Sequence, residues 1–266
     1  MIRIRFINFL LISKLIFMDA ASFVFLLVVS FLTAVMGSLI GMAMLVLLPV
    51  MIFLGVPVHT AVATGRFSMI GIGIGNITKF SKGNRIKLKY FLPFAIAGVI
   101  GSFIGASFLV FVDEKLLKSL IGWFMIFVSI LVLFEDFIKS KNFHHRITFK
   151  HHFLSVAAGL FIGGYIGVIG GGGATLVILL LTLIYGLNLH DAIANQKAVT
   201  LPISIIATLV FIYQGLIDYK LGTPLFIVNV AGGWLGADLI TKFKAIWLKR
   251  ILVPIIILLA LKLIFF

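Results

Sequence analysis

Ten apolar blocks, separated by charged loops and glycines, constrain this sequence more than any other feature. A helix needs about 20 residues to cross the hydrocarbon core of a bilayer. The first half has apolar segments at residues 20–36, 42–55, 61–79, 90–111 and 117–135, and the second half at 153–167, 174–187, 194–213, 222–240 and 247–265. The pattern predicts an all-α polytopic membrane protein with about eight to ten transmembrane helices.

Composition argues against an ordinary soluble domain. Hydrophobic residues make up 62% of the chain and charged residues 11%, and the mean hydropathy is +1.26. A soluble protein of this length cannot bury so much apolar side chain, because much of its surface must face water. We therefore predict a multi-pass membrane protein surrounded by the lipid bilayer.

The charge pattern fits the same prediction. The formal net charge is +14, but the basic residues occur in short loops between apolar segments, which is the positive-inside bias of membrane proteins. We expect no nucleic-acid partner. Cysteine is absent, which excludes disulfides, thiolate catalysis and cysteine metal sites.

The two halves of the sequence resemble each other at a constant offset. When the sequence is shifted by 131 positions, Gly41 falls on Gly172, His59 on His190, and Pro93 on Pro224. Matches between Leu and Ile are common in apolar sequence, whereas matched His, Pro and Gly at one offset are not. The sequence therefore predicts two homologous repeats of about five helical segments each.

Loop charge predicts that the repeats have opposite orientation. The loop between the third and fourth segments is basic in the first half, whereas in the second half the basic cluster follows the fourth segment. If basic loops are cytoplasmic, five crossings per half invert the second repeat. With four crossings per half, the cluster around Lys242 would lie outside.

The expected boundaries follow from these segments. We expect an N-terminal interfacial segment at 1–19, repeat 1 at 20–138, a basic cytoplasmic linker at 139–152 and repeat 2 at 153–266. The basic residues 3, 5 and 14 of the first segment favour an interfacial helix. An alternative is that Met18 is the true start.

Glycine-rich junctions are the first candidate binding elements. Glycines at 37 and 41 separate the first two segments, and glycines at 170 to 173 separate the equivalent pair. Short segments interrupted by glycine at corresponding positions of two halves point to a transporter's binding site. A helix that starts inside the membrane also presents unpaired N–H groups to anions. The candidate residues are Gly41, Ala43, Gly171, Gly172, Gly173, Ala174 and Thr175. The alternative is helix packing by small residues.

Two basic residues are aligned by the repeat inside the third segments. Arg66 and Lys197 each lie past the histidine at the mouth of the segment. Intramembrane cations are costly and indicate function, so the pair could converge on one anion. The alternative is that both side chains extend to the nearest interface. Uncharged candidates on the same segments are Thr64, Asn76, Asn195 and Gln196.

The residues present do not support catalysis or metal binding. The sequence has no Gly-x-Ser-x-Gly, no His-Glu-x-x-His and no paired intramembrane carboxylates. The histidines at 144, 145, 151 and 152 lack partner carboxylates at a fixed spacing, and His59 and His190 are better explained as interfacial caps than as a proton relay. We expect no enzyme activity, no cofactor and no metal.

Several glycine motifs resemble the TauE/SafE family of sulfite and organosulfur-anion permeases. They are the run from Gly167 to Ala174, the segment from Gly186 to Ala194, and the pattern Gly232 to Ala237 with its echo at Gly101 to Ala106. The resemblance covers nearly the whole chain from residue 20 onward. It implies a cytoplasmic-membrane transporter of small sulfur-containing anions. The first half departs from the family pattern at Met42 and Met44, where glycines are usual.

The sequence therefore predicts a permease that carries a small anion by alternating access between inverted repeats. The resemblance implies sulfite or an organosulfur anion as the solute. Two alternatives stay open, an anion channel and a membrane assembly factor that transports nothing. The sequence does not determine the direction of transport, the coupling ion or whether the chain forms a homo-oligomer.

Overall fold

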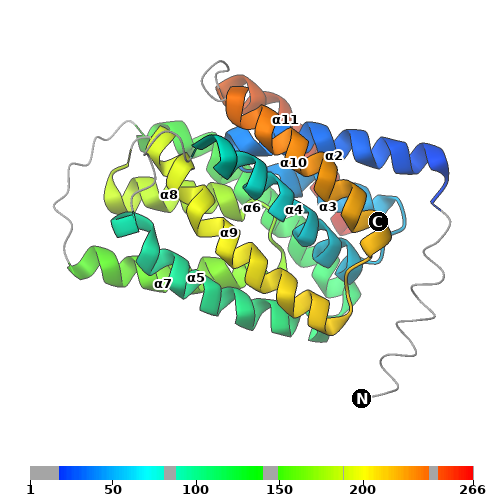
Figure 1. Ribbon diagram of the computed structural model, residues 1–266, viewed down its shortest axis with the longest axis horizontal. Helices are drawn as coiled ribbons and strands as arrows, with labels where there is room; N and C mark the ends of the chain where they lie inside the picture. Colours follow the sequence, from blue (N-terminus) through cyan, green and yellow to red (C-terminus); the bar gives the residue numbers. More distant parts are fainter. Residues whose placement is uncertain (1–17, 81–87, 140–148, 188, 240–244, 266) are drawn as a thin grey trace.

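The computed structural model describes residues 18–80, 88–139, 149–187, 189–239 and 245–265 (Figure 1). Within these ranges the regular secondary structure is entirely helical. The first half contains α2 (Ala20–Ile40), α3 (Ala43–Phe53), α4 (Val58–Phe80), α5 (Leu88–Phe108), the short 3₁₀ helix η2 (Leu109–Phe111) and α6 (Glu114–Lys139). The second half contains α7 (Phe149–Val168), α8 (Gly173–Tyr185), α9 (Leu189–Gln214), α10 (Tyr219–Leu239) and α11 (Ala245–Phe265).

Each predicted apolar segment corresponds to one α-helix, but the first helix of each half is longer than its predicted segment. The helix α2 has 21 residues and α7 has 20, so only α3 and α8, with 11 and 13, are short. The predicted segment ended just before Gly37. That glycine lies within α2, where close packing in a membrane tolerates it.

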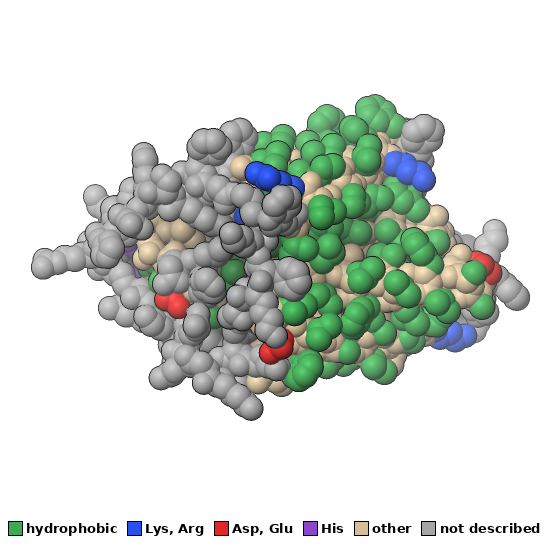
Figure 2. Space-filling model, turned by 90° about the horizontal axis from the view of Figure 1, so that it is seen from above, with side chains coloured by type: hydrophobic (Ala, Val, Ile, Leu, Met, Phe, Trp, Pro, Cys, Tyr) green, Lys and Arg blue, Asp and Glu red, His purple; other side chains and the backbone are tan. Residues whose placement is uncertain are grey.

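The described helices carry apolar side chains on the outside as well as the inside. Five spans are long and apolar enough to cross a bilayer: Ala20–Ile40, Leu92–Phe111, Glu114–Leu133, His151–Val168 and Asp191–Gln214. Phe111 and Phe161 are 82% and 76% exposed, which suits contact with lipid better than contact with water. Figure 2 shows hydrophobic side chains across most of the described part of one face. These are the features of a multi-pass membrane protein.

Helices of one half pack against helices of the other. The most extensive pairings are α5 with α7 and α10 with α4, followed by α10 with α2 and α5 with α9. Figure 1 shows α2 and α10 along one edge of the bundle, α5 and α7 along the opposite edge, and α4 and α9 between them. The two third helices, α4 and α9, therefore meet in the middle of the molecule.

Glycines allow the outer pairs to approach closely. A Cβ atom on Gly101 of α5 would clash with the Leu160 carbonyl of α7 and lie 2.8 Å from the Gly164 nitrogen. On α10, a Cβ on Gly232, the equivalent of Gly101 at the 131-residue offset, would lie 2.7 Å from the Cβ of Ala34 on α2. Small residues let membrane helices pack backbone to backbone. Glycines at positions related by the repeat thus serve the α5–α7 and α10–α2 interfaces alike.

Two of the predicted regions lie largely outside the described residues. These are the interfacial segment at 1–19, of which only 18 and 19 are described, and the central part of the linker at 139–152. The helix α7 begins at Phe149, inside the range assigned to the linker. Both assignments stay predictions.

The close approach of α5 to α7 predicts which glycines tolerate a methyl group. Gly101→Ala should lower the melting temperature in detergent micelles, because backbone atoms must move apart at an overpacking cost of about 1–3 kcal/mol. Gly164→Ala on the facing helix is the matched control, since its Cβ would meet only the Gly101 oxygen, at 3.6 Å. Equal melting temperatures for the two variants would contradict this account of the interface.

Candidate functional site

Both short helices begin at glycine breaks in the backbone. Between α2 and α3, Gly41 adopts the left-handed conformation with φ of 80°. Between α7 and α8, Gly170 and Gly172 both have φ of 76°. Glycine adopts this conformation at little cost. Neither α3 nor α8 has a side-chain cap at its start, so the first N–H groups of both helices lack an intrahelical or capping partner.

The two breaks lie against each other. A Cβ on Gly41 would lie 3.0 Å from the Ala174 Cβ and 3.1 Å from the Thr175 nitrogen. The Thr175 hydroxyl donates to the carbonyl of Ile40, the last residue of α2, at 3.0 Å. The start of α8 therefore pairs with an orphan carbonyl at the end of α2, and the halves join where their helices are interrupted.

A cavity of about 80 Å³ lies where the breaks meet α4 and α9. One water needs roughly 10–15 Å³ on this measure, so the cavity has room for several waters or one small polyatomic ion. Its walls come from both breaks and from one face of each third helix. The lining residues are Gly37, Gly41, Ala43, Met44, Arg66, Met69, Ile72, Gly73, Asn76, Ile166, Gly170, Ala174, Gln196, Lys197, Thr200, Leu201 and Ser204.

Arg66 reaches from α4 to the break of the opposite half. It lies in the third turn of α4, is 4% exposed, and its Nη2 donates to the Ile166 carbonyl at 2.5 Å. A Cβ on Gly170 would clash with the guanidinium. Only glycine therefore leaves room for Arg66 at this break, and the side chain does not extend to an interface.

Lys197 makes the reciprocal contact with the first half. It lies in the third turn of α9 and is 6% exposed. Its Nζ donates to the Gly37 carbonyl of α2 at 3.5 Å. Each cation thus lies at the carboxyl end of a helix from the other half, where the helix dipole favours positive charge. None of the described residues that line the cavity carries a carboxylate.

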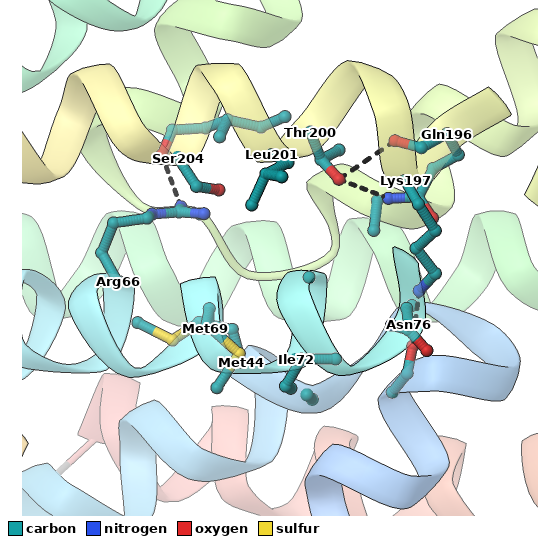
Figure 3. A pocket seen from close by; sticks show the side chains of 17 residues that line it. Met44, Arg66, Met69, Ile72, Asn76, Gln196, Lys197, Thr200, Leu201 and Ser204 are labelled. Atoms are coloured by element: carbon teal, nitrogen blue, oxygen red, sulfur yellow. Dashed lines mark hydrogen bonds between the residues drawn. The ribbon is translucent and has the colours of Figure 1, made fainter. Parts of the chain in front are cut away.

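The two cations lie at opposite ends of the cavity. Figure 3 shows Arg66 near Ser204 at one end and Lys197 beside Asn76 at the other, so α4 and α9 run antiparallel. A Cβ on Gly73 would lie 2.7 Å from Leu201, which fixes their alignment. Arg66 and Lys197 lie on opposite sides of this contact along the two helix axes. At a rise of 1.5 Å per residue, their backbones are about 16 Å apart along those axes. The two cations therefore face different ends of the cavity rather than one common point.

Several buried polar atoms at the cavity have no hydrogen-bond partner among the described residues. They are Nε of Arg66, Oδ1 and Nδ2 of Asn76, and Oε1 of Gln196. Buried polar groups are nearly always paired, and an unpaired one costs free energy comparable to a lost hydrogen bond. Their gathering around one cavity indicates a polar occupant.

Seven of the predicted site residues line the cavity: Gly41, Ala43, Arg66, Asn76, Ala174, Gln196 and Lys197. The other six make contacts at the breaks, with a nearby loop or within their own helix instead. Gly171 accepts from Tyr165, Gly172 and Gly173 face Val128 and Ile166, Thr175 bonds Ile40, Asn195 donates to the Asp191 carbonyl, and Thr64 accepts from the Asp218 N–H.

Tyr165, which holds the second break in place, is not among the residues predicted from the sequence. Its hydroxyl donates to the Gly171 carbonyl, and its ring centroid lies 4.5 Å from that of Phe124 on α6. One tyrosine in an apolar helix draws no attention by itself, and its contact with α6 is distant in sequence. Met69 was missed because an apolar residue on α4 gives no polar signal.

The histidine at the start of α4 has a structural contact. The His59 ring nitrogen Nε2 bonds the Val112 carbonyl at 2.9 Å and so links the start of α4 to the loop after η2. The side chain of His190 and the histidines at 144 and 145 lie outside what the structure describes. Within the described residues, no three His, Asp or Glu side chains gather as a metal site would require.

Comparison with known proteins identifies membrane transporters as relatives. A probable membrane transporter of Bacillus subtilis, YdhB, is 26% identical over 73% of this chain and 80% of its own length. A probable membrane transporter of Haemophilus influenzae is 22% identical over 87% of this chain and 89% of its own. Another from a Sinorhizobium species, ORF9, is 24% identical over 90% and 91%.

No solved structure matches the chain. The sequence matches the family described as sulfite exporter TauE/SafE over residues 26–263, which includes both breaks, both cations and every described residue that lines the cavity. The chain is a member of the sulfite exporter TauE/SafE family.

Proposed function

We propose that this protein is a permease that carries a small anion, sulfite or an organosulfur anion, across the cell membrane by alternating access. The family assignment supports transport of sulfur-containing anions, and the names of the relatives support a membrane transporter. One observation carries the proposal. A buried cavity holds two cations, two uncapped helix starts and unpaired polar atoms, with no carboxylate among its described lining residues.

The electrostatics of the cavity favour an anion. A buried cation without an opposite charge is costly, and carbonyl oxygens offset that cost only in part. Nε of Arg66 has no partner among the described residues, and Lys197 has three donors of which one makes a long bond to Gly37. The starts of α3 and α8 add N–H groups and the positive ends of two helix dipoles. Asn76 and Gln196 add unpaired amide atoms at the same cavity.

The separation of the cations changes the expected site from one shared site to two half-sites. We define the Arg66 half-site by Arg66 and Gly170, and the Lys197 half-site by Lys197, Gly37 and Asn76. A small anion does not span both cations, so it would be held at one half-site and then at the other. In this scheme the apolar side chains between them, including those of residues 69 and 201, separate the two positions.

Reciprocal packing supports the inverted relation of the halves. The third helices, equivalent by sequence, run antiparallel at the centre of the molecule. Around them, the pairing of α5 with α7 is matched by that of α10 with α2, and α5 with α9 by α10 with α4. A two-fold axis in the membrane plane produces such exchanged pairs, and inverted repeats of this kind exchange inward and outward access by moving against each other.

The first prediction from this proposal concerns anion affinity. Arg66→Gln and Lys197→Gln should each weaken binding of sulfite or methanesulfonate by the full-length protein by about 10- to 100-fold, the worth of a charge-assisted hydrogen bond. Binding is measured in detergent by calorimetry. Lys220→Gln is the matched control, because Lys220 is exposed at the start of α10, away from the cavity.

Transport is measured with the same variants in proteoliposomes. Uptake of labelled sulfite and methanesulfonate by the wild type and by Lys220→Gln should exceed that of empty vesicles, and should be lost in the cavity variants. Flux equal to that of empty vesicles for the wild type with both anions would reject transport of these solutes. Flux as fast as that of an open pore would favour a channel.

A second prediction concerns the opposite orientation of the halves. Lys87 and Asp218 occupy equivalent positions of the two repeats, and the chain has no cysteine of its own. In separate variants, Lys87→Cys should react with an impermeant maleimide from the cytoplasmic side and Asp218→Cys from the outer side. Labelling is compared in right-side-out and inverted vesicles. Reaction of both positions from one side would rule out inverted repeats.

A further inference from the structure

The two half-sites differ in the kind of cation that they hold. Arg66 donates to Ile166 at 2.5 Å, and its guanidinium fits against Gly170 so closely that a methyl group there would clash. Lys197, at the position equivalent by sequence, makes one bond of 3.5 Å to Gly37. Arginine keeps its proton under all ordinary conditions, whereas a buried lysine can lose one. The repeat thus supplies a fixed charge at one half-site and a titratable one at the other.

Among the described residues around Lys197, no group would hold its charge permanently. The helices packed against α9 are α4, α5, α7 and α8, and α2 contributes the Gly37 carbonyl. The charged or titratable side chains of these helices nearest the cavity are Arg66, of the same sign, and Tyr165, which bonds Gly171. The other titratable side chains described on these helices do not line the cavity: His59, His151, His152 and Tyr185. On α9 itself, Asp191 and Tyr213 do not line it either.

The remaining polar neighbours of Lys197 are uncharged. They are Asn76 on α4 and Gln196 and Thr200 on α9, which line the same cavity. Amide and hydroxyl groups stabilise a buried charge less than an opposite charge does. The Gly37 carbonyl and the dipole of α2 offset only part of the cost of a buried ammonium, so a lasting positive charge at this position requires an anion beside it.

Resting on the proposed function, we propose that Lys197 binds a proton together with the transported anion, so that the protein is a proton–anion symporter. In the empty Lys197 half-site the amine is neutral. Arrival of the anion brings a proton onto Nζ, and departure of the anion releases it. Arg66 stays charged throughout and attracts the anion from its own end of the cavity. One proton therefore moves with each anion in the same direction.

This coupling has a quantitative consequence. If anion and proton bind together, each raises the affinity for the other by the same factor. Anion affinity should therefore fall as pH rises, approaching about tenfold per pH unit where the empty site is deprotonated, because one proton is taken up per anion bound. Anion binding should also withdraw protons from a weakly buffered solution.

The test uses methanesulfonate as the probe, because it stays ionised across the range and any pH dependence belongs to the protein. Its dissociation constant and the proton uptake on binding are measured for the full-length protein from about pH 6 to pH 10, a range wide enough for a buried lysine. In proteoliposomes, an inward methanesulfonate gradient should acidify the interior of vesicles that hold a pH-sensitive dye. Lys220→Arg should behave as the wild type does.

Lys197→Arg replaces the titratable cation by a fixed one, so its anion affinity should not change with pH and its binding should take up no proton. Lys197→Gln should bind more weakly, and equally at each pH, which provides a second test if the arginine variant does not fold. Anion flux by the wild type without proton movement would overturn the proton site and leave the proposed function standing. Proton uptake that persists in a folded Lys197 variant would also overturn it. Absence of both binding and flux would overturn the proposed function and the coupling with it.

Discussion

The structure depends on how two interruptions of the helical backbone are satisfied inside an apolar bundle. Backbone outside a helix survives at membrane depth only where it is buried in protein or lines a polar cavity. Here each interruption is supported by the other half: Thr175 bonds the end of α2, Arg66 the end of α7, and Lys197 the last turn of α2. The site is consequently the place where the two halves hold each other, and neither half could form it alone.

The sequence predicted the helices well because each apolar segment is bounded by charge or by a helix-breaking glycine. It failed where glycine has another role. Gly37 lies inside α2 and permits contact with Ala43 at the start of α3, whereas Gly41 ends the helix with a left-handed backbone. Both are glycines in apolar sequence, and only the tertiary contact distinguishes them. The positions of the breaks were readable, but the lengths of the helices leading to them were not.

Helical periodicity explains which candidate residues reach the cavity. On α4, residues 66, 69, 73 and 76 recur at three- and four-residue spacing and share a face, whereas Thr64 bonds the loop before α10. On α9, residues 197, 200, 201 and 204 do the same, and Asn195 bonds back to its own helix. If the candidate residues had been chosen from the helix faces that carry Arg66 and Lys197, Met69 would have been included. Thr64 and Asn195 would have been excluded. The carbonyl partners of the cations come from tertiary packing and carry no sequence signal.

Comparison of equivalent positions in the two halves distinguishes residues near the breaks that the backbone requires from residues that can differ. The breaks need glycine wherever the backbone is left-handed or a guanidinium lies against it, as at Gly41 and Gly170. Other positions near the breaks do not require glycine. At equivalent positions the first half has Met44 and Arg66 where the second has Thr175 and Lys197. If the cavity carries an anion as proposed, unlike cations at its two ends would give those ends different affinities for the same anion and different responses to pH, which is what the proposed coupling of an anion to a proton requires.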